Sequence, residues 1–161
     1  MLGTTASTDL GFASGWATYS YINCKLSSQC SVDLGSSRYV FIDITSAAAT
    51  SASPHTITIT GLSELLTLYG GNTYPIYPVI YANSAQYTDI TVSLSSDAMI
   101  DCYGSTSCIA TLINSVRNTQ LYPSMINCTM STGCQATCTN NPACYLRCDG
   151  STGCTALIKD T

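Results

Sequence analysis

The chain has 161 residues, ten cysteines and one histidine, and only 9% of its residues are charged, against roughly 25% in ordinary soluble domains. Its net charge of −4 with five basic residues excludes the basic footprint of a protein that binds nucleic acid or an anionic membrane. An apolar fraction of 45% with so little charge excludes intrinsic disorder, and no run of about eighteen apolar residues is present to span a membrane.

The N-terminal segment is apolar and almost free of charge, which predicts an arm that contacts a neighbouring copy. Met1–Thr5 has no basic residue ahead of an apolar stretch, so we expect no signal peptide within the numbered chain. Residues 10–22 have the composition of a segment that adds to another sheet as a strand. The residues expected in this arm are Leu10, Phe12, Trp16, Tyr19, Tyr21 and Ile22.

Residues 34–100 contain no cysteine and have the pattern of several short β-strands. The expected strands are Tyr39–Ile44, Thr56–Thr60, Ile76–Tyr81 and Ile90–Ser95. In the second and fourth of these, apolar residues alternate with threonine or serine, as in a strand with one buried face. Pro75 and Pro78 would place the third strand at a sheet edge, because proline donates no ladder hydrogen bond.

The ten cysteines form five pairs, and each pair has the spacing C-x5-C. The pairs are Cys24/Cys30, Cys102/Cys108, Cys128/Cys134, Cys138/Cys144 and Cys148/Cys154. An even count at one repeated spacing predicts a disulfide framework formed in an oxidising compartment. Bridges within each pair are the simplest connectivity, because the first pair is far from the next. The alternative is a zinc site made of Cys128, Cys134, Cys138 and Cys144, although zinc sites usually have shorter C-x2–4-C spacings.

The sequence around the cysteine pairs also repeats. Each copy has an aliphatic residue, a polar residue and Cys, then two variable residues, Ser, Ser or Thr, one variable residue and Cys. Copies occupy residues 22–30, 100–108, 126–134 and 146–154, with 138–144 as a degenerate fifth, and they recur every ten residues from Cys128 onward. We expect each copy to form a strand, a tight turn and a second strand. So short a unit cannot bury its own apolar face, so the copies are expected to stack as a solenoid.

The segment Cys148-Asp-Gly-Ser-Thr-Gly-Cys-Thr-Ala156 resembles one coil of the cysteine-rich β-solenoid antifreeze proteins of beetles, which repeat Cys-Thr-x-Ser-x-x-Cys-x-x-Ala. It is also similar to the Cys-Ser-Gly-Ser-type repeats of secreted surface proteins in protists and algae. The resemblance covers roughly the last third of the chain and the copy at Cys24. It implies a β-solenoid fold and, from the antifreeze family, ice binding. The ten-residue step is shorter than in that family, and Thr-Cys-Thr occurs once, at residues 137–139.

Residues with catalytic potential are few. His55 is the single histidine, and its place after Pro54 in a Ser/Ala-rich stretch predicts a solvated loop residue. Asp89 and Asp101 are the alternative, a glycosidase pair, because carboxylates meet in space rather than in sequence. No activated nucleophile and no cofactor motif accompanies them, so we expect no catalytic activity, no cofactor and no metal ion.

Two features concern carbohydrate. Asn127-Cys128-Thr129 is an N-glycosylation sequon, which predicts a covalent glycan on Asn127. Aromatic residues are a candidate sugar-stacking platform, although tyrosines in strands are more typical of a core or an interface. The residues of that platform would be Trp16, Tyr19, Tyr21, Tyr69, Tyr74, Tyr77 and Tyr81.

These patterns predict an all-β fold. The favoured architecture is a disulfide-stapled β-solenoid resembling a β-helix, with a β-sandwich as the alternative for residues 34–100. We expect a β-rich region with the N-terminal arm over residues 1–100 and a cysteine-rich short-repeat region over residues 101–161. The two regions would otherwise be one continuous domain over residues 1–161.

The function that these patterns favour is structural. Low charge, hydroxyl-rich strands and disulfide staples predict an extracellular or cell-surface subunit that assembles with copies of itself into a filament or surface layer. Neither nucleic acid nor a membrane span is expected among its partners. The alternative is a secreted ice- or carbohydrate-binding solenoid. That function requires a flat face on which Thr56, Thr58 and Thr60 lie beside Thr137 and Thr139, or a similar rank of threonines.

Overall fold

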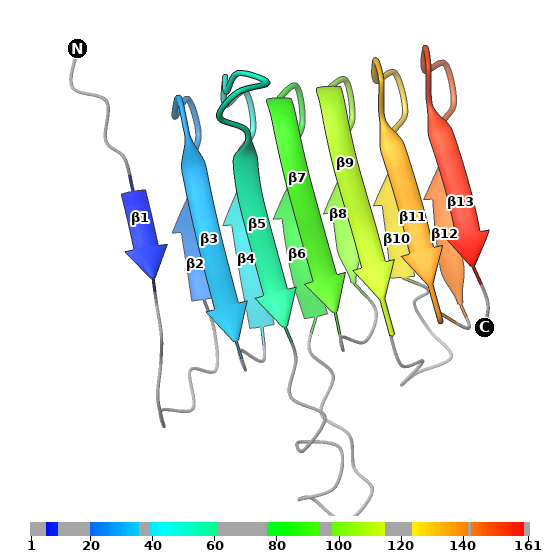
Figure 1. Ribbon diagram of the computed structural model, residues 1–161, viewed down its shortest axis with the longest axis horizontal. Helices are drawn as coiled ribbons and strands as arrows, with labels where there is room; N and C mark the ends of the chain where they lie inside the picture. Colours follow the sequence, from blue (N-terminus) through cyan, green and yellow to red (C-terminus); the bar gives the residue numbers. More distant parts are fainter. Residues whose placement is uncertain are drawn as a thin grey trace, which may run out of the picture.

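The computed structural model describes residues 6–9, 20–35, 39–60, 77–93, 98–114, 124–141 and 143–159, and its regular elements are all β-strands (Figure 1). The strands are β1 (Ala6–Asp9), β2 (Ser20–Asn23), β3 (Cys30–Gly35), β4 (Tyr39–Asp43), β5 (His55–Thr60), β6 (Tyr77–Tyr81), β7 (Gln86–Ser93), β8 (Met99–Asp101), β9 (Thr106–Ile113), β10 (Ser124–Asn127), β11 (Gln135–Thr139), β12 (Cys144–Arg147) and β13 (Thr155–Lys159). The expected all-β class is confirmed.

The strands form two sheets in which every neighbouring pair is parallel. Sheet A has the order β1-β3-β5-β7-β9-β11-β13, and sheet B has the order β2-β4-β6-β8-β10-β12. The chain alternates between the sheets, so each strand of sheet B leads through a turn to the next strand of sheet A. We call such a pair a rung and number the rungs from β2–β3 (rung 1) to β12–β13 (rung 6). The turns within the rungs lie together at one end of the sheets, which we call the turn end (Figure 1).

The rungs stack in register. Ile22 pairs with Ile42, and Ile126 pairs with Leu146, so a basic rung is 20 residues long. The expected ten-residue period is therefore half a rung. The reason is that Cys138 and Cys144 connect β11 to β12 at the end opposite the turn end. The cysteine pairs of the last two rungs thus alternate between the two ends of the sheets.

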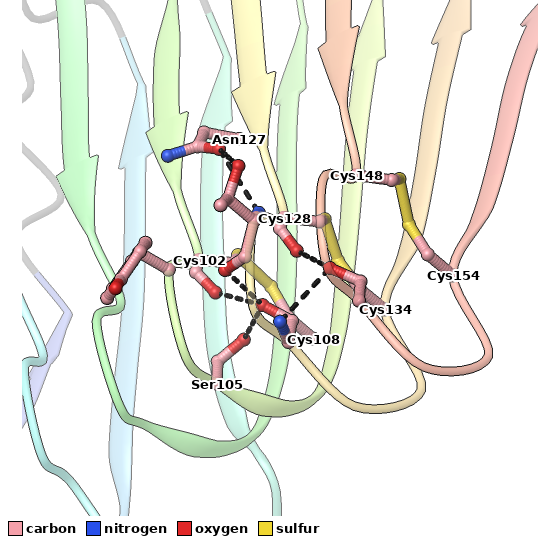
Figure 2. The surroundings of a disulfide bond; sticks show 12 residues. Cys102, Ser105, Cys108, Asn127, Cys128, Cys134, Cys148 and Cys154 are labelled. Carbon is pink, nitrogen blue, oxygen red and sulfur yellow. Dashed lines mark hydrogen bonds between the residues drawn. A yellow bond between two sulfur atoms is a disulfide. The ribbon is translucent and has the colours of Figure 1, made fainter.

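All five cysteine pairs form local disulfides, as their spacing predicts. Four of them close the turn end, in rungs 1, 4, 5 and 6, and three of these lie stacked one above another in Figure 2. Cys128 and Cys134 are 0% exposed, whereas Cys148 and Cys154 in rung 6 are only partly buried. The disulfides are therefore part of the core in the middle of the stack.

The serine that recurs in each copy links the turns of adjacent rungs. The Ser131 hydroxyl donates a hydrogen bond of 2.5 Å to the Cys102 carbonyl of the rung before, and the Ser151 hydroxyl donates to the Cys128 carbonyl in the same way. Each of these carbonyls also accepts the backbone N–H of the serine in its own turn, Ser105 at 3.1 Å and Ser131 at 3.2 Å. The serine hydroxyl therefore adds a bond between rungs to a turn that is already closed, a contribution of roughly 0.5–1.5 kcal/mol.

Inward-facing side chains fill the space between the sheets. Those that are 0% exposed include Ile42, Ile57, Ile80, Ile90, Ile100 and Ile126. Burial of each such side chain contributes roughly 1.5–3 kcal/mol. In rungs 4 and 5 the sheet A column continues with Ala110 and Ala136, next to the buried disulfides. Small residues beside bulky sulfur pairs keep the interior close-packed.

Some expectations from the sequence are wrong. Pro78 does not mark an edge, because its strand β6 lies between β4 and β8 and the proline side chain is buried. Proline is tolerated here because the β8 ladder begins only at Val79. The β-sandwich alternative does not fit either, because the ladders within residues 39–93 are parallel. Across residue 100 both sheets continue, since β6 pairs with β8 and β7 pairs with β9.

Candidate functional site

Four threonines form a column on the outer face of sheet A. Thr58 pairs with Thr91, Thr91 with Thr111, and Thr111 with Thr137. All four side chains are partly exposed. Adjacent strands lie about 4.8 Å apart, so the hydroxyl and methyl groups repeat at that spacing across rungs 2 to 5. We call this column the threonine rank.

A second column lies two residues further along the same strands. It consists of Thr60, Ser93, Ile113 and Thr139. The Ser93 hydroxyl lies 3.4 Å from the Thr60 hydroxyl oxygen. Together the two columns form an array in which neighbouring columns are about 7 Å apart, the length of two residues in a strand. None of the eight side chains is ionisable.

The buried face of sheet A holds this array in place. Ile57 and Ile59 point inward and are at most 1% exposed, so Thr58 and Thr60 must point outward. The same alternation operates in β7, where Ile90 is 0% exposed. Threonine and isoleucine are branched at Cβ and have few rotamers in a strand. The array is therefore pre-organised, and binding would order few further side-chain torsions.

Four of the five threonines named from the sequence lie in this array. Thr58 and Thr137 lie in the threonine rank, and Thr60 and Thr139 lie in the second column, in each case with two rungs between them. Thr56 lies in a different column, next to Asp89. Sequence reasoning missed Thr91 and Thr111, which complete the rank. The outward positions of their strands were the signal that pointed to them.

The outer face of sheet B is different, because its central column is apolar. This column, which we call the apolar ladder, pairs strand by strand across all six rungs. Its members are Tyr21, Phe41, Val79, Met99, Met125 and Tyr145. The Tyr21 and Phe41 rings stack on each other, with centroids 5.3 Å apart and an interplanar angle of 20°. Phe41 therefore covers one face of the Tyr21 ring, which leaves less of that ring for the expected sugar-stacking platform.

The structure describes the side chains of only some of the residues expected in the arm and the sugar-stacking platform. Tyr21 and Ile22 belong to β2, the edge strand of sheet B, and Tyr81 contacts Phe41 edge-on at 5.2 Å. The remaining residues lie outside those whose side chains the structure describes. They are Leu10, Phe12, Trp16, Tyr19, Tyr69, Tyr74 and Tyr77.

Polar residues at the ends of the sheet B strands start the turns. Asn23, Asp43, Asp101 and Asn127 each accept a hydrogen bond from the backbone N–H two residues later, at 3.0–3.3 Å. This is the Asx-turn geometry that favours asparagine and aspartate at turn starts. Burial raises the pKa of the Asp43 carboxyl, but hydrogen bonds from Lys25 and Thr45 outweigh it and lower the pKa overall.

The sequon residue Asn127 is already hydrogen-bonded in the fold. Its side-chain amide donates to Asp101 at 2.9 Å, and its carbonyl oxygen accepts the Thr129 hydroxyl at 2.6 Å. A glycan on the amide nitrogen would remove one of its two N–H donors. Glycosylation at Asn127 remains a prediction.

His55 is not a solvated loop residue. It begins β5, is 0% exposed, and its Nδ1 accepts the Cys30 backbone N–H at 2.9 Å. It pairs with Thr88, which pairs with Cys108, so it occupies the column of the second cysteines in a rung without a disulfide. Burial lowers the pKa of His55 below its ordinary 6.5, and the Ala47 carbonyl opposes this shift. The role of His55 is to fill and bond the core.

We predict that acid destabilises the protein through His55. Between pH 6.5 and the lowered pKa of the folded state, the unfolded chain binds a proton that the folded chain does not. The free energy of unfolding should therefore keep its full value above pH 6.5, where His55 is neutral in both states, and should fall as the pH drops below 6.5. Urea unfolding at pH 7.5 and 5.5 measures this loss. His55→Asn keeps an acceptor for Cys30 but does not titrate, so its loss should be smaller; an equal loss would contradict the prediction.

The residues of two further sites considered from the sequence, a glycosidase pair and a zinc site, do not lie together in the structure. Asp89 lies on the outer face of sheet A and Asp101 on that of sheet B, so the core separates them and they cannot form a glycosidase pair. The proposed zinc ligands are also divided, because Cys138–Cys144 lies at the end opposite Cys128–Cys134. The sulfur atoms that do lie within 4.8 Å of one another are those of Cys128, Cys134 and Cys154, all of which are disulfide-bonded.

Comparison of the chain with protein-family models, curated proteins and solved structures finds no match. Among the described residues, the structure has no helix of the length and hydropathy needed to cross a membrane. The features of the molecule that bear on its function are therefore the two outer faces and the disulfides.

Proposed function

We propose that this chain is a disulfide-stapled β-solenoid, secreted into an oxidising extracellular compartment, and that it binds ice through the threonine rank. The in-register array of Thr58, Thr91, Thr111 and Thr137 supports this function most directly. Five local disulfides and the absence of free cysteines support the compartment. The threonine array supports the resemblance to the beetle antifreeze proteins more directly than the cysteine spacing does.

The chemistry of the array suits an ordered water surface. Each threonine presents a hydroxyl that bonds to water and a methyl group that excludes it, and both repeat across the sheet along the threonine rank; in the second column both groups occur only at Thr60 and Thr139. The four hydroxyls repeat at the regular strand spacing of about 4.8 Å, so a surface with a matching regular spacing can contact all of them at once. An ammonium or carboxylate within the array would hold its own hydration shell. The eight side chains of the array are uncharged and lie between two charged residues, Asp33 next to Thr58 and Lys159 next to Thr139, so the array itself favours ice over an ionic ligand.

Thr111→Lys tests this proposal. The lysine places a hydrated charge at the centre of the threonine rank, and an exposed substitution should change stability by no more than about 0.5 kcal/mol. We expect the oxidised wild-type protein to produce thermal hysteresis and to shape ice crystals, and the variant to lose most of both. Tyr103→Lys is the matched control, because Tyr103 is an exposed turn residue of the same rung, outside the array, at the repeat position where rung 1 has Lys25.

Three outcomes would contradict ice binding. They are wild-type protein without thermal hysteresis, a Thr111→Lys variant as active as wild type, and equal losses in the Thr111→Lys and Tyr103→Lys variants. A glycan array run on the same wild-type preparation separates ice from carbohydrate as the target. Binding to an insoluble polysaccharide without thermal hysteresis would assign the threonine rank to carbohydrate instead.

A structural role is the second candidate, and rung 6 favours it. In the part of the chain that the structure describes, β13 pairs with β11 alone. Its Ile158 is 52% exposed, whereas Cys138, which occupies the same column in β11, is 0% exposed. An open parallel edge with exposed core residues can accept a strand of another copy, which would extend the stack into a filament. Electron microscopy of the oxidised protein tests this candidate; dispersed particles at high concentration would contradict it.

A further inference from the structure

The apolar ladder on sheet B is the largest feature that ice binding leaves unexplained. It covers six strands, so at the usual strand spacing it extends for about 24 Å. Tyr21 at one end is 63% exposed and Tyr145 at the other is 53% exposed. No residue of the ladder is charged. A continuous apolar stripe on a flat sheet is typical of a protein interface.

Charges beside the ladder indicate what covers it. Lys25 and Asp149 occupy the same position of the repeat, directly after the first cysteine of rungs 1 and 6. They are opposite in charge and both exposed, with 50% and 66% of their side chains accessible. Lys25 bonds to Asp43 at 2.9 Å, and Asp149 pairs with Arg147. Each end of the ladder therefore has one positive and one negative group in mirrored order.

We propose that a second copy of this chain covers the ladder, in a symmetric dimer whose twofold axis runs parallel to the strands. This rotation places rung 1 of one copy over rung 6 of the other and keeps the turn ends together. Lys25 then faces Asp149 of the second copy, twice in the dimer, because the interface is isologous. Tyr21 lies over Tyr145, Phe41 over Met125 and Val79 over Met99, so bulky pairs occur at the ends and smaller ones at the centre.

The alternative rotation, with the axis along the rung stack, loses this complementarity. It places each rung over its own equivalent and moves the two turn ends to opposite sides. Lys25 and Asp149 would then have no counterpart across the interface. The charge pattern therefore favours the first arrangement. The proposal does not depend on ice binding, because the threonine rank lies on sheet A, and the dimer would present two such ranks on opposite outer surfaces.

Sedimentation equilibrium of the oxidised protein tests the dimer. Met99→Glu places a charge at the centre of the interface and should weaken association by roughly thirtyfold or more. Met99 is partly exposed on the outer face, so the fold should tolerate the change. Thr106→Lys on sheet A is the control and should leave association unchanged. A wild-type protein that stays monomeric, or a Met99→Glu variant that still dimerises, would overturn the proposal.

Charge reversal tests the arrangement within the dimer. Lys25→Asp should weaken association roughly fivefold to tenfold, because it converts two attractive pairs into repulsive ones. Adding Asp149→Lys should restore it, since the pairs become attractive again with their order reversed. Rungs 1 and 6 are far apart within one copy, so rescue cannot come from a local contact. Failure of the second substitution to rescue the first would overturn the arrangement.

Discussion

Replacing Cys128 and Cys134 together by alanine is expected to lower the free energy of unfolding by about 3–5 kcal/mol. Two effects add. The bridge closes a short loop in the unfolded chain, which contributes about 2 kcal/mol in the chain-entropy model. Both sulfur atoms also lie in the core, where the cysteines are 0% exposed, so their removal leaves a cavity that the rigid stack fills poorly.

The Cys148–Cys154 disulfide separates these two effects. Its sequence separation of 6 is the same as that of Cys128–Cys134, so the loop entropies are equal. It is only partly buried, so its replacement by alanines should cost about 2 kcal/mol and create little cavity. Urea unfolding of both double variants under oxidising conditions measures the difference between their losses in the free energy of unfolding. Equal losses would show that the buried disulfide contributes nothing through packing.

Much of the fold could be predicted from the sequence, because two local signals are strong. The spacing C-x5-C favoured the five local disulfides without excluding other pairings, and all five form in the structure with Cα separations of 6.0–6.5 Å. The alternation of Thr56–Thr60 specified which face of β5 is buried. Both signals act over a few residues, so neither depends on the rest of the chain.

The parts that sequence reasoning missed concern the rungs without cysteine. Rungs 2 and 3 have Ile44 and Ala82 where the others have a first cysteine, and His55 and Thr88 where the others have a second. Without a marker, the histidine was placed in a loop and Pro78 at an edge. Both residues are tolerated because neighbouring rungs pair with them on either side.

The threonine rank was missed in part for a related reason. Thr58 and Thr91 are adjacent in the sheet although the residues between them include 61–76, which no period of ten or twenty accommodates. Sequence alternation determines that a threonine points outward, but the register between strands depends on how long each connection is. The individual faces were therefore predictable, whereas the column that joins them was not.

A sixth disulfide is expected if Ala82 and Thr88 are both replaced by cysteine. The segment 82–88 has the length of a C-x5-C copy, and its ends lie in register with Cys102 and Cys108. Its backbone also matches. Ser84 and Tyr87 have positive φ values of 55° and 51°, at the same positions as Met130 and Ser107 in the cysteine-bearing turns, which have 58° and 55°. Rung 3 therefore has the backbone of the repeat without its cysteines.

Closing this loop should raise the free energy of unfolding by about 2 kcal/mol. Part of any gain in the free energy of unfolding would come from removing the Thr88 hydroxyl, because this hydroxyl is buried without a hydrogen-bond partner. Thr88→Val measures that part alone and should stabilise the protein by about 1 kcal/mol. Free-thiol titration of the Ala82→Cys/Thr88→Cys variant establishes whether the bridge forms, and urea unfolding before and after mild reduction measures its effect.

This experiment tests whether the turn of rung 3 can hold a disulfide, although the natural rung has none. Ala82 and Thr88 are buried, at 0% and 2% exposed, so a bridge between these positions would be as enclosed as Cys102–Cys108. If the new bridge forms and stabilises the fold, the turn end is a regular scaffold in which any rung of this length accepts a disulfide. If the two thiols stay free in an otherwise folded protein, the turn of rung 3 differs from its neighbours. The register that places His55 and Thr88 in the cysteine column would then be wrong.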